Sequence, residues 1–164
     1  MSKIFSLLVL IASLSIAFAK NSVSRRQVSF NRGYLPRCKY DELVIKNNEL
    51  FAEKIGDAHV VFTGKVTSDV LVINNNTVQF SVIVRRYFKN SLGLPKNREV
   101  RISKALNDGE GVKCRQPVRV KYTAIFIGRK PLRSLDVDVA LTISPVPVTL
   151  NNLDRVSAAT KGRK

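Results

Sequence analysis

The chain has 164 residues, 45% of them hydrophobic, and a net charge of +16 at pH 7. This length and composition suit one globular domain with a single core and leave little room for a second domain. Residues 85–133 hold 14 of the 28 lysines and arginines but three of the 12 acidic residues, so one half of the domain is expected to attract polyanions.

The first residues have the pattern of a secretory signal peptide. Lys3 provides the positive charge, residues 4–18 form a mostly apolar run, and Ala17-Phe18-Ala19 has the small-x-small form of a cleavage site. This run is shorter than the roughly 20 apolar residues that a membrane span needs, and no later segment is long and apolar enough to be one. We therefore expect residues 1–19 to be removed and the rest of the chain to be secreted.

Two cysteines, Cys38 and Cys114, remain after this expected cleavage. In an oxidising compartment an even pair is typical of one disulfide, which we predict here. The alternative is a pair of buried free thiols.

Residues 20–37 are polar and basic without a clear period, which predicts a flexible N-terminal arm. The domain then begins with a predicted amphipathic helix over residues 38–55, where apolar side chains recur every three or four positions. Asp41 and Glu42 lie in its first turn and Gly56 follows its last, as is typical of helix ends.

From residue 58 onwards the hydrophobic period is two, which predicts β-strands. A strand over residues 59–73 contains Gly64, a position suited to a bulge or bend. An Asn-rich turn joins it to a second strand over residues 78–89, so the two are expected to form a hairpin. Further elements are predicted as strands over residues 98–103, 118–128 and 136–144, a short helix over residues 150–156, and a basic tail over residues 158–164.

This order of elements predicts a mainly β fold with flanking helices. Five or six strands between an N-terminal and a C-terminal α-helix favour a five-stranded OB-fold-like barrel. A β-sandwich is the second choice, but the seven strands that it needs are not visible in the pattern.

Three segments, in order, resemble the N-terminal agrin domain, a laminin-binding module of the netrin-module and metalloproteinase-inhibitor (TIMP-like) superfamily. They are "DAHVVFTGKV" (57–66), "VIVRRYFKN" (82–90) and "VTLNNLDRV" (148–156). Cys38 and Cys114 also fall where that family places a cysteine before the first helix and one before the late strands. The resemblance implies a TIMP-like OB-fold domain over residues 38–157 and a secreted extracellular-matrix module that binds laminin.

The C-terminal helix of that family presents apolar residues to the laminin coiled coil. The corresponding candidates in this chain are Leu150, Leu153 and Val156, which are spaced to share one helical face. Leu153 matches a partner-facing position of the family, whereas the position one heptad later falls near Thr160, which is polar.

A basic cluster follows the strand in "SVIVRRYFKN". We expect it to form a face that binds heparan sulfate-type glycans and retains the protein on heparin. The alternative is a solvated face with no partner. The candidate residues are Arg85, Arg86, Lys89, Lys96, Arg98 and Arg101.

Asn75 begins an N-glycosylation sequon in a predicted hairpin tip. Nothing in the pattern indicates an enzyme, a cofactor or a metal site, since the single histidine, His59, has no second histidine or spare cysteine to join it. Asp136 and Asp138 would share one strand face, which we interpret as solvated.

Two other functional classes stay open. A TIMP-like protease inhibitor needs a cysteine at its mature N-terminus, and Cys38 lies well inside the expected secreted chain. An OB-fold that binds single-stranded nucleic acid needs exposed aromatic residues, for which the candidates are Phe80, Tyr87, Phe88 and Tyr122. The expected secretion argues against a nucleic-acid partner.

Overall fold

The computed structural model describes residues 35–73, 76–107, 112–132 and 136–162. The predicted signal peptide over residues 1–19, most of the predicted arm, and Asn75 lie outside these described residues. Within the described ranges, no helix combines the length and the apolar character needed to cross a bilayer.

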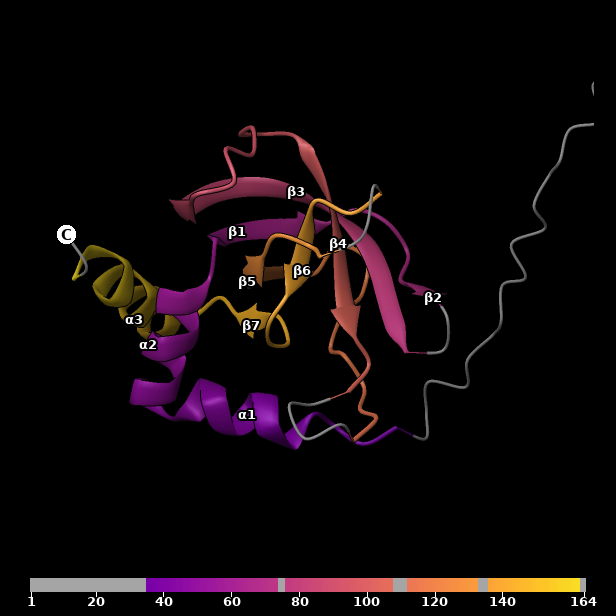
Figure 1. The fold of residues 1–164 in the computed structure, drawn as a ribbon, viewed down its shortest axis with the longest axis horizontal. Helices are drawn as coiled ribbons and strands as arrows, with labels where there is room; N and C mark the ends of the chain where they lie inside the picture. Colours follow the sequence, from indigo (N-terminus) through magenta and orange to yellow (C-terminus); the bar gives the residue numbers. More distant parts are fainter. Residues whose placement is uncertain (1–34, 74–75, 108–111, 133–135, 163–164) are drawn as a thin grey trace, which may run out of the picture.

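The described part of the chain is mainly β-structure, built around a closed five-stranded barrel (Figure 1). In order around the barrel, its strands are β1 (Val60–Val66), β3 (Thr77–Asn90), β4 (Glu99–Ala105), β6 (Val139–Leu141) and β5 (Thr123–Arg129). Strand β5 pairs with β1 and closes the ring, and every pair is antiparallel except β4 with β6. Two short strands, β2 (Leu71–Ile73) and β7 (Val146–Pro147), pair outside the ring. The predicted OB-fold-like barrel is confirmed.

One hydrophobic core fills the inside of the barrel. In β3, alternate residues from Val78 to Val84 are buried, while the residues between them are half-buried or exposed, which is the alternation that the sequence predicts. Phe62 of β1 stacks on Phe126 of β5, with the ring centroids 5.3 Å apart. These two residues are cross-strand partners, and Phe80 of β3 also contacts Phe126, with ring centroids 6.3 Å apart, so an aromatic cluster lies at the centre of the core.

A second core covers the outer face of β1 and β5. There Val61, Ile125 and Ile127 are buried against helix residues such as Phe51 and Val156. The helices are α1 (Lys39–Lys46), α2 (Asn48–Asp57) and α3 (Leu150–Lys161). Figure 1 shows them gathered on the side of the barrel away from β2. The first and last parts of the domain thus shield the same face.

The predicted single helix over residues 38–55 is wrong in one respect, because the chain forms two helices that meet at Asn47. The backbone of Asn47 is extended, and its Oδ1 accepts hydrogen bonds from the backbone N–H groups of Glu49 (2.9 Å) and Leu50 (3.1 Å). Asparagine is a strong N-cap because its side chain satisfies the free donors of a new helix. It therefore ends α1 and starts α2.

The predicted domain ends also differ from the structure. Residues 35–37 are not part of a free arm, because the backbone N–H of Arg115 donates to the carbonyl oxygen of Pro36 (2.7 Å). At the other end, α3 continues to Lys161, so residues 158–161 are helical rather than tail. The predicted strand over residues 59–73 divides into β1 and β2, and the strand predicted from residue 118 begins at Thr123.

Gly64 lies where the pairing of β1 with β3 shifts register, as the sequence suggested. A Cβ atom at this position would lie 2.9 Å from the carbonyl oxygen of Ile83 and would also collide with Val82. Only glycine lets β3 approach β1 this closely, so the residue is required by packing.

The predicted disulfide is present between Cys38 and Cys114, which are 76 residues apart in the sequence, and both residues are buried. It joins the start of α1 to the connection between β4 and β5. Disulfides of this kind are typical of oxidising compartments, so the folded chain belongs in such an environment.

Replacing both cysteines with serine should lower the free energy of unfolding by about 4 kcal/mol, because the bond closes a long loop in the unfolded chain. Guanidinium denaturation measures this loss of stability when the oxidised wild type is compared with the reduced wild type and with the double variant. Equal midpoints for the reduced and oxidised wild type would contradict it.

Candidate functional site

The residues predicted to bind glycans lie on β3, on β4 and on the connection between them, at one end of the barrel (Figure 1). The pairing of β3 with β1 skips Arg85 and then Phe88, so β3 carries two bulges in quick succession. A bulge breaks the in-and-out alternation of a strand. Arg85 and Arg86 are consequently both exposed although they are neighbours in the sequence.

Arg86 has an aromatic contact, and neither Arg85 nor Arg86 has an acidic partner in the described structure. The guanidinium of Arg86 lies over the ring of Phe88, 5.0 Å from its centroid, an arrangement in which the cation is attracted by the aromatic face. Neither Arg85 nor Arg86 forms an ion pair within the described residues. Their charges are therefore available to an external anion.

Two further basic residues lie at the same end of the barrel. Lys96 and Arg98 are exposed in the connection that follows β3. The backbone N–H of Val84 donates to the carbonyl oxygen of Arg98 (3.4 Å), which puts Arg98 beside the bulged part of β3. We call Arg85, Arg86, Lys96 and Arg98 the basic surface.

The remaining two candidates, Lys89 and Arg101, are engaged within the protein. The Nζ of Lys89 donates to the carbonyl oxygen of Gly56 (2.8 Å) near the end of α2, where free carbonyl groups need donors. Arg101 forms an exposed ion pair with Asp136 (3.7 Å), and its backbone N–H donates to Asp138 (2.8 Å). Lys89 is thus a structural contact, and the charge of Arg101 is partly balanced.

Asp136 and Asp138 precede β6 and converge on Arg101 rather than forming a free pair of acids. They line a polar depression of 480 Å³ with Arg98 and Glu99. Its mixture of charges makes this depression a poor site for a polyanion, and Arg98 is the one lining residue that it shares with the basic surface.

The aromatic candidates do not form a stacking platform. Phe80 is buried inside the barrel, and Tyr87 packs on Phe62 with its hydroxyl donating to the carbonyl oxygen of Pro95 (3.2 Å). Burial raises the pKa of Tyr87, and the charge of Asp138 raises this pKa further. Phe88 is covered by Arg86.

The three candidate residues for laminin on α3 do not share an available face. Val156 has 0% of its surface exposed and belongs to the second core, Leu153 is half-buried against that core, and Leu150 is 82% exposed. The inclusion of Val156 in a partner surface is therefore wrong. The helix turns by about 100° per residue, so positions 152 and 156 face the barrel while position 150 faces away.

The hydroxyl of Thr160 donates to the carbonyl oxygen of Val156 (2.9 Å). Its polar group is satisfied by its own helix, and the residue is half-buried. This position adds no apolar surface to α3.

A buried polar cluster lies beneath α1, and no sequence pattern predicts its long-range contacts. One carboxylate oxygen of Asp41 accepts hydrogen bonds from the backbone N–H (2.8 Å) and the hydroxyl of Ser144, and Lys104 lies 3.7 Å away. Nearby, Gln116 donates to Sγ of Cys38 (3.3 Å). The cluster and the disulfide together fasten α1 to the wall of the barrel.

Arg155 is a second residue that sequence reasoning missed. Its guanidinium donates to the carbonyl oxygens of Ile45 (2.7 Å) and Asn47 (3.2 Å) and lies over the ring of Phe51. It therefore connects α3 to the junction of α1 and α2.

His59 is exposed and its Nδ1 accepts a hydrogen bond from the backbone N–H of Lys130 (3.1 Å). Over the described ranges, no group of three or more His, Cys, Asp or Glu residues is placed to hold a metal ion.

These features define a disulfide-linked, OB-fold-like barrel domain with an exposed basic end. A scan of the chain against protein-family models matches no family, and a search of curated proteins finds no match.

Replacing Lys89 with Met should lower the free energy of unfolding by about 1 kcal/mol, because the carbonyl oxygen of Gly56 loses its charged donor. Lys96→Met is the matched control, since Lys96 is exposed at the same end of the barrel. Chemical denaturation of both variants measures the difference. Equal stabilities would show that the contact between Lys89 and Gly56 contributes nothing.

Proposed function

We propose that this chain is a secreted extracellular binding module whose basic surface binds heparan sulfate-type glycans. The observation that carries the proposal is the pair of bulges in β3, which exposes Arg85 and Arg86 side by side without acidic partners in the described structure. Arg98 and Lys96 extend the same charge along the connection to β4.

Sulfate groups suit this arrangement chemically. A guanidinium presents a planar set of donors that can bind two oxygens of an oxyanion at once, whereas a lysine acts as a point charge. The contact of Arg86 with Phe88 limits the freedom of its side chain, which reduces the entropy lost on binding. Three arginines and one lysine therefore form a better sulfate site than scattered lysines would.

The compartment supports the same proposal. The buried disulfide indicates an oxidising environment, and the first 19 residues have the pattern of an export signal. Sulfated glycans are abundant polyanions outside cells, so an exported basic domain meets them there. Localisation to the extracellular matrix follows from binding them.

Replacing Arg85 and Arg86 together with glutamine should weaken heparin binding at least about tenfold, because two charge-assisted contacts are lost. The double variant Lys39→Gln and Lys46→Gln is the matched control. It removes the same charge from α1, which lies at the other end of the molecule in Figure 1.

Heparin affinity chromatography and calorimetry at fixed salt concentration compare the two variants. Elution of the arginine variant at clearly lower salt than the lysine variant supports the basic surface. If both elute together, the interaction reports only net charge, and the proposed site is wrong.

A second candidate function is contact with a laminin coiled coil through the start of α3. The favouring observation is an apolar pair, Val148 (41% exposed) and Leu150 (82% exposed), at the N-terminal end of the helix. Burying exposed apolar side chains of this kind at an interface is favourable, by about 25 cal/mol per Å² of apolar surface removed from water. The resemblance to the N-terminal agrin domain is the reason that we propose laminin as the partner of this apolar pair.

Leu150→Ala should weaken binding to a laminin coiled-coil fragment while changing the free energy of unfolding by less than about 0.5 kcal/mol, because the side chain is exposed. Val156→Ala should instead cost about 2 kcal/mol of stability, because it leaves a cavity in the second core. Surface plasmon resonance and thermal denaturation measure the two effects. Unchanged laminin binding by a folded Leu150→Ala variant would remove laminin as a partner.

The alternative of a TIMP-like protease inhibitor gains no support from the geometry. The carbonyl oxygen of Pro36 accepts a hydrogen bond from Arg115, so the residues before Cys38 are part of the folded domain. In this fold Cys38 follows residues whose backbone is hydrogen-bonded to the connection between β4 and β5, so Cys38 does not present a free amine.

A further inference from the structure

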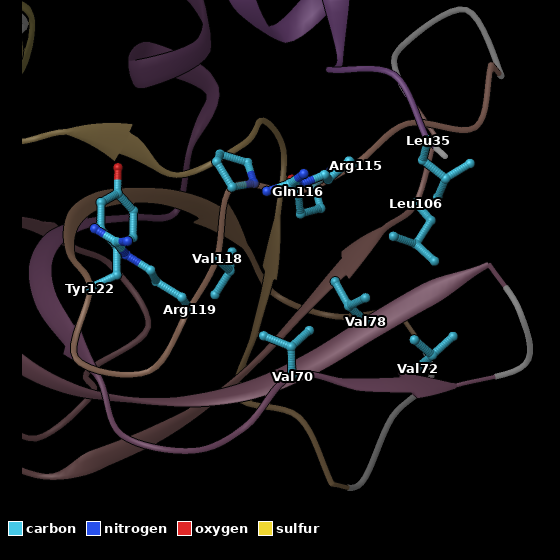
Figure 2. A pocket seen from close by; sticks show the side chains of 11 residues that line it. Leu35, Val70, Val72, Val78, Leu106, Arg115, Gln116, Val118, Arg119 and Tyr122 are labelled. Carbon is cyan, nitrogen blue, oxygen red and sulfur yellow. The ribbon is translucent and has the colours of Figure 1, made fainter. Parts of the chain in front are cut away.

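A pocket of 390 Å³ opens at the barrel end where the β2–β3 hairpin meets the connection between β4 and β5 (Figure 2). Its volume is in the range of about 300 to 1,000 Å³ that small-molecule sites occupy. Its apolar lining consists of Leu35, Val70, Val72, Val78, Leu106 and Val118. Val78, Leu106 and Val118 belong to the barrel core, so the floor of the pocket is the core itself.

One wall of this pocket is cationic and polar. Figure 2 shows Arg119 alongside the ring of Tyr122 on one side of the apolar residues, with the Tyr122 hydroxyl pointing away from the valines, and Arg115 beside Gln116 at the upper edge of the lining. Neither arginine forms an ion pair within the described residues. Burial raises the pKa of Tyr122, and the positive charge of Arg119 acts against this rise. The hydroxyl of Tyr122 is therefore a neutral hydrogen-bond donor at physiological pH.

The walls are held in place by the surrounding backbone. The N–H of Cys114 donates to the carbonyl oxygen of Leu106 (2.8 Å), and the N–H of Lys121 donates to that of Val66 (2.9 Å). The disulfide of Cys114 fastens the same connection to the start of α1. A preformed site binds without the entropy cost of ordering its walls.

We propose that this pocket binds a small amphiphile with an aliphatic chain and a carboxylate head group. The chain would lie among the valines and leucines, and the carboxylate would accept hydrogen bonds from the guanidinium of Arg119. An apolar floor beside guanidinium groups that form no ion pair within the described residues is complementary to such a molecule in both hydrophobicity and charge.

The charge of the pocket argues against residues 20–34 as its occupant. Residues 20–34, which precede Leu35 in the sequence, include Lys20, Arg25, Arg26 and Arg32 and no acidic residue. A basic segment would be repelled by Arg115 and Arg119. An anionic ligand gains from the same charges.

The pocket is separate from the basic surface. Val78 lies near the start of β3 and Arg85 lies in its second half, next to the bulges. Changes at Arg119 and at Arg85 therefore test the two proposals independently.

The test is a titration of the purified protein, with its methyl groups labelled for nuclear magnetic resonance, using dodecanoate below its micelle-forming concentration. Resonances of Val72, Val78 and Leu106 should shift in a saturable manner, while those of Ile127 and Val146 in the second core should not. Arg119→Gln should weaken the binding about tenfold, since a charge-assisted hydrogen bond is lost. Arg85→Gln is the matched control and should leave the affinity for dodecanoate unchanged.

Three results would overturn the proposal. The first is an equal response to dodecyltrimethylammonium, which has the same chain with a cationic head. The second is an absence of saturable shifts at the pocket methyl groups, including the case in which contacts from residues 20–34 already fill the site.

A Val72→Trp variant is designed to fill the pocket. It should lose the shifts caused by dodecanoate while retaining its affinity for heparin. The third contrary result is a folded Val72→Trp variant that still binds dodecanoate.

Discussion

The pairing of β1 with strands on both of its sides is the constraint on which the rest of the structure depends. Because β1 bonds to β3 along one edge and to β5 along the other, the sheet closes and leaves no free edge on this strand. Its side chains then divide between two cores, with Phe62 inside the barrel and Val61 outside. A strand that is apolar on both faces requires a second layer, and the three helices supply it.

Beyond the apolar contacts of the second core, polar side chains bond to free backbone groups at the ends of the helices. Arg155 donates to carbonyl oxygens at the end of α1, and Lys89 donates to one near the end of α2. Asn47 satisfies the first free N–H groups of α2. Helix ends leave such groups without partners inside the helix, so these side chains determine where each helix stops and which part of the barrel it covers.

The two ends of the barrel differ in chemistry because different constraints act on them. At one end, bulges in β3 disrupt the alternation of the strand and expose adjacent arginines. At the other end, the long connection before β5, which the disulfide joins to the start of α1, lines an apolar pocket together with β2. Charge at one end and hydrophobic volume at the other suit different ligands.

The sequence alone determined the fold class, the hairpin, the disulfide and the C-terminal helix, since hydrophobic period and turn residues are local signals and two cysteines allow one pairing. Tertiary structure decided which polar side chains remain free: Lys89 is bound to Gly56, whereas Arg85 is exposed by a bulge. It also decided that Val156 is buried and that Leu150 is not. Spacing along a helix shows which residues share a face, but it does not show how much of that face the barrel covers. Such burial depends on contacts between residues far apart in the chain, which no local pattern records.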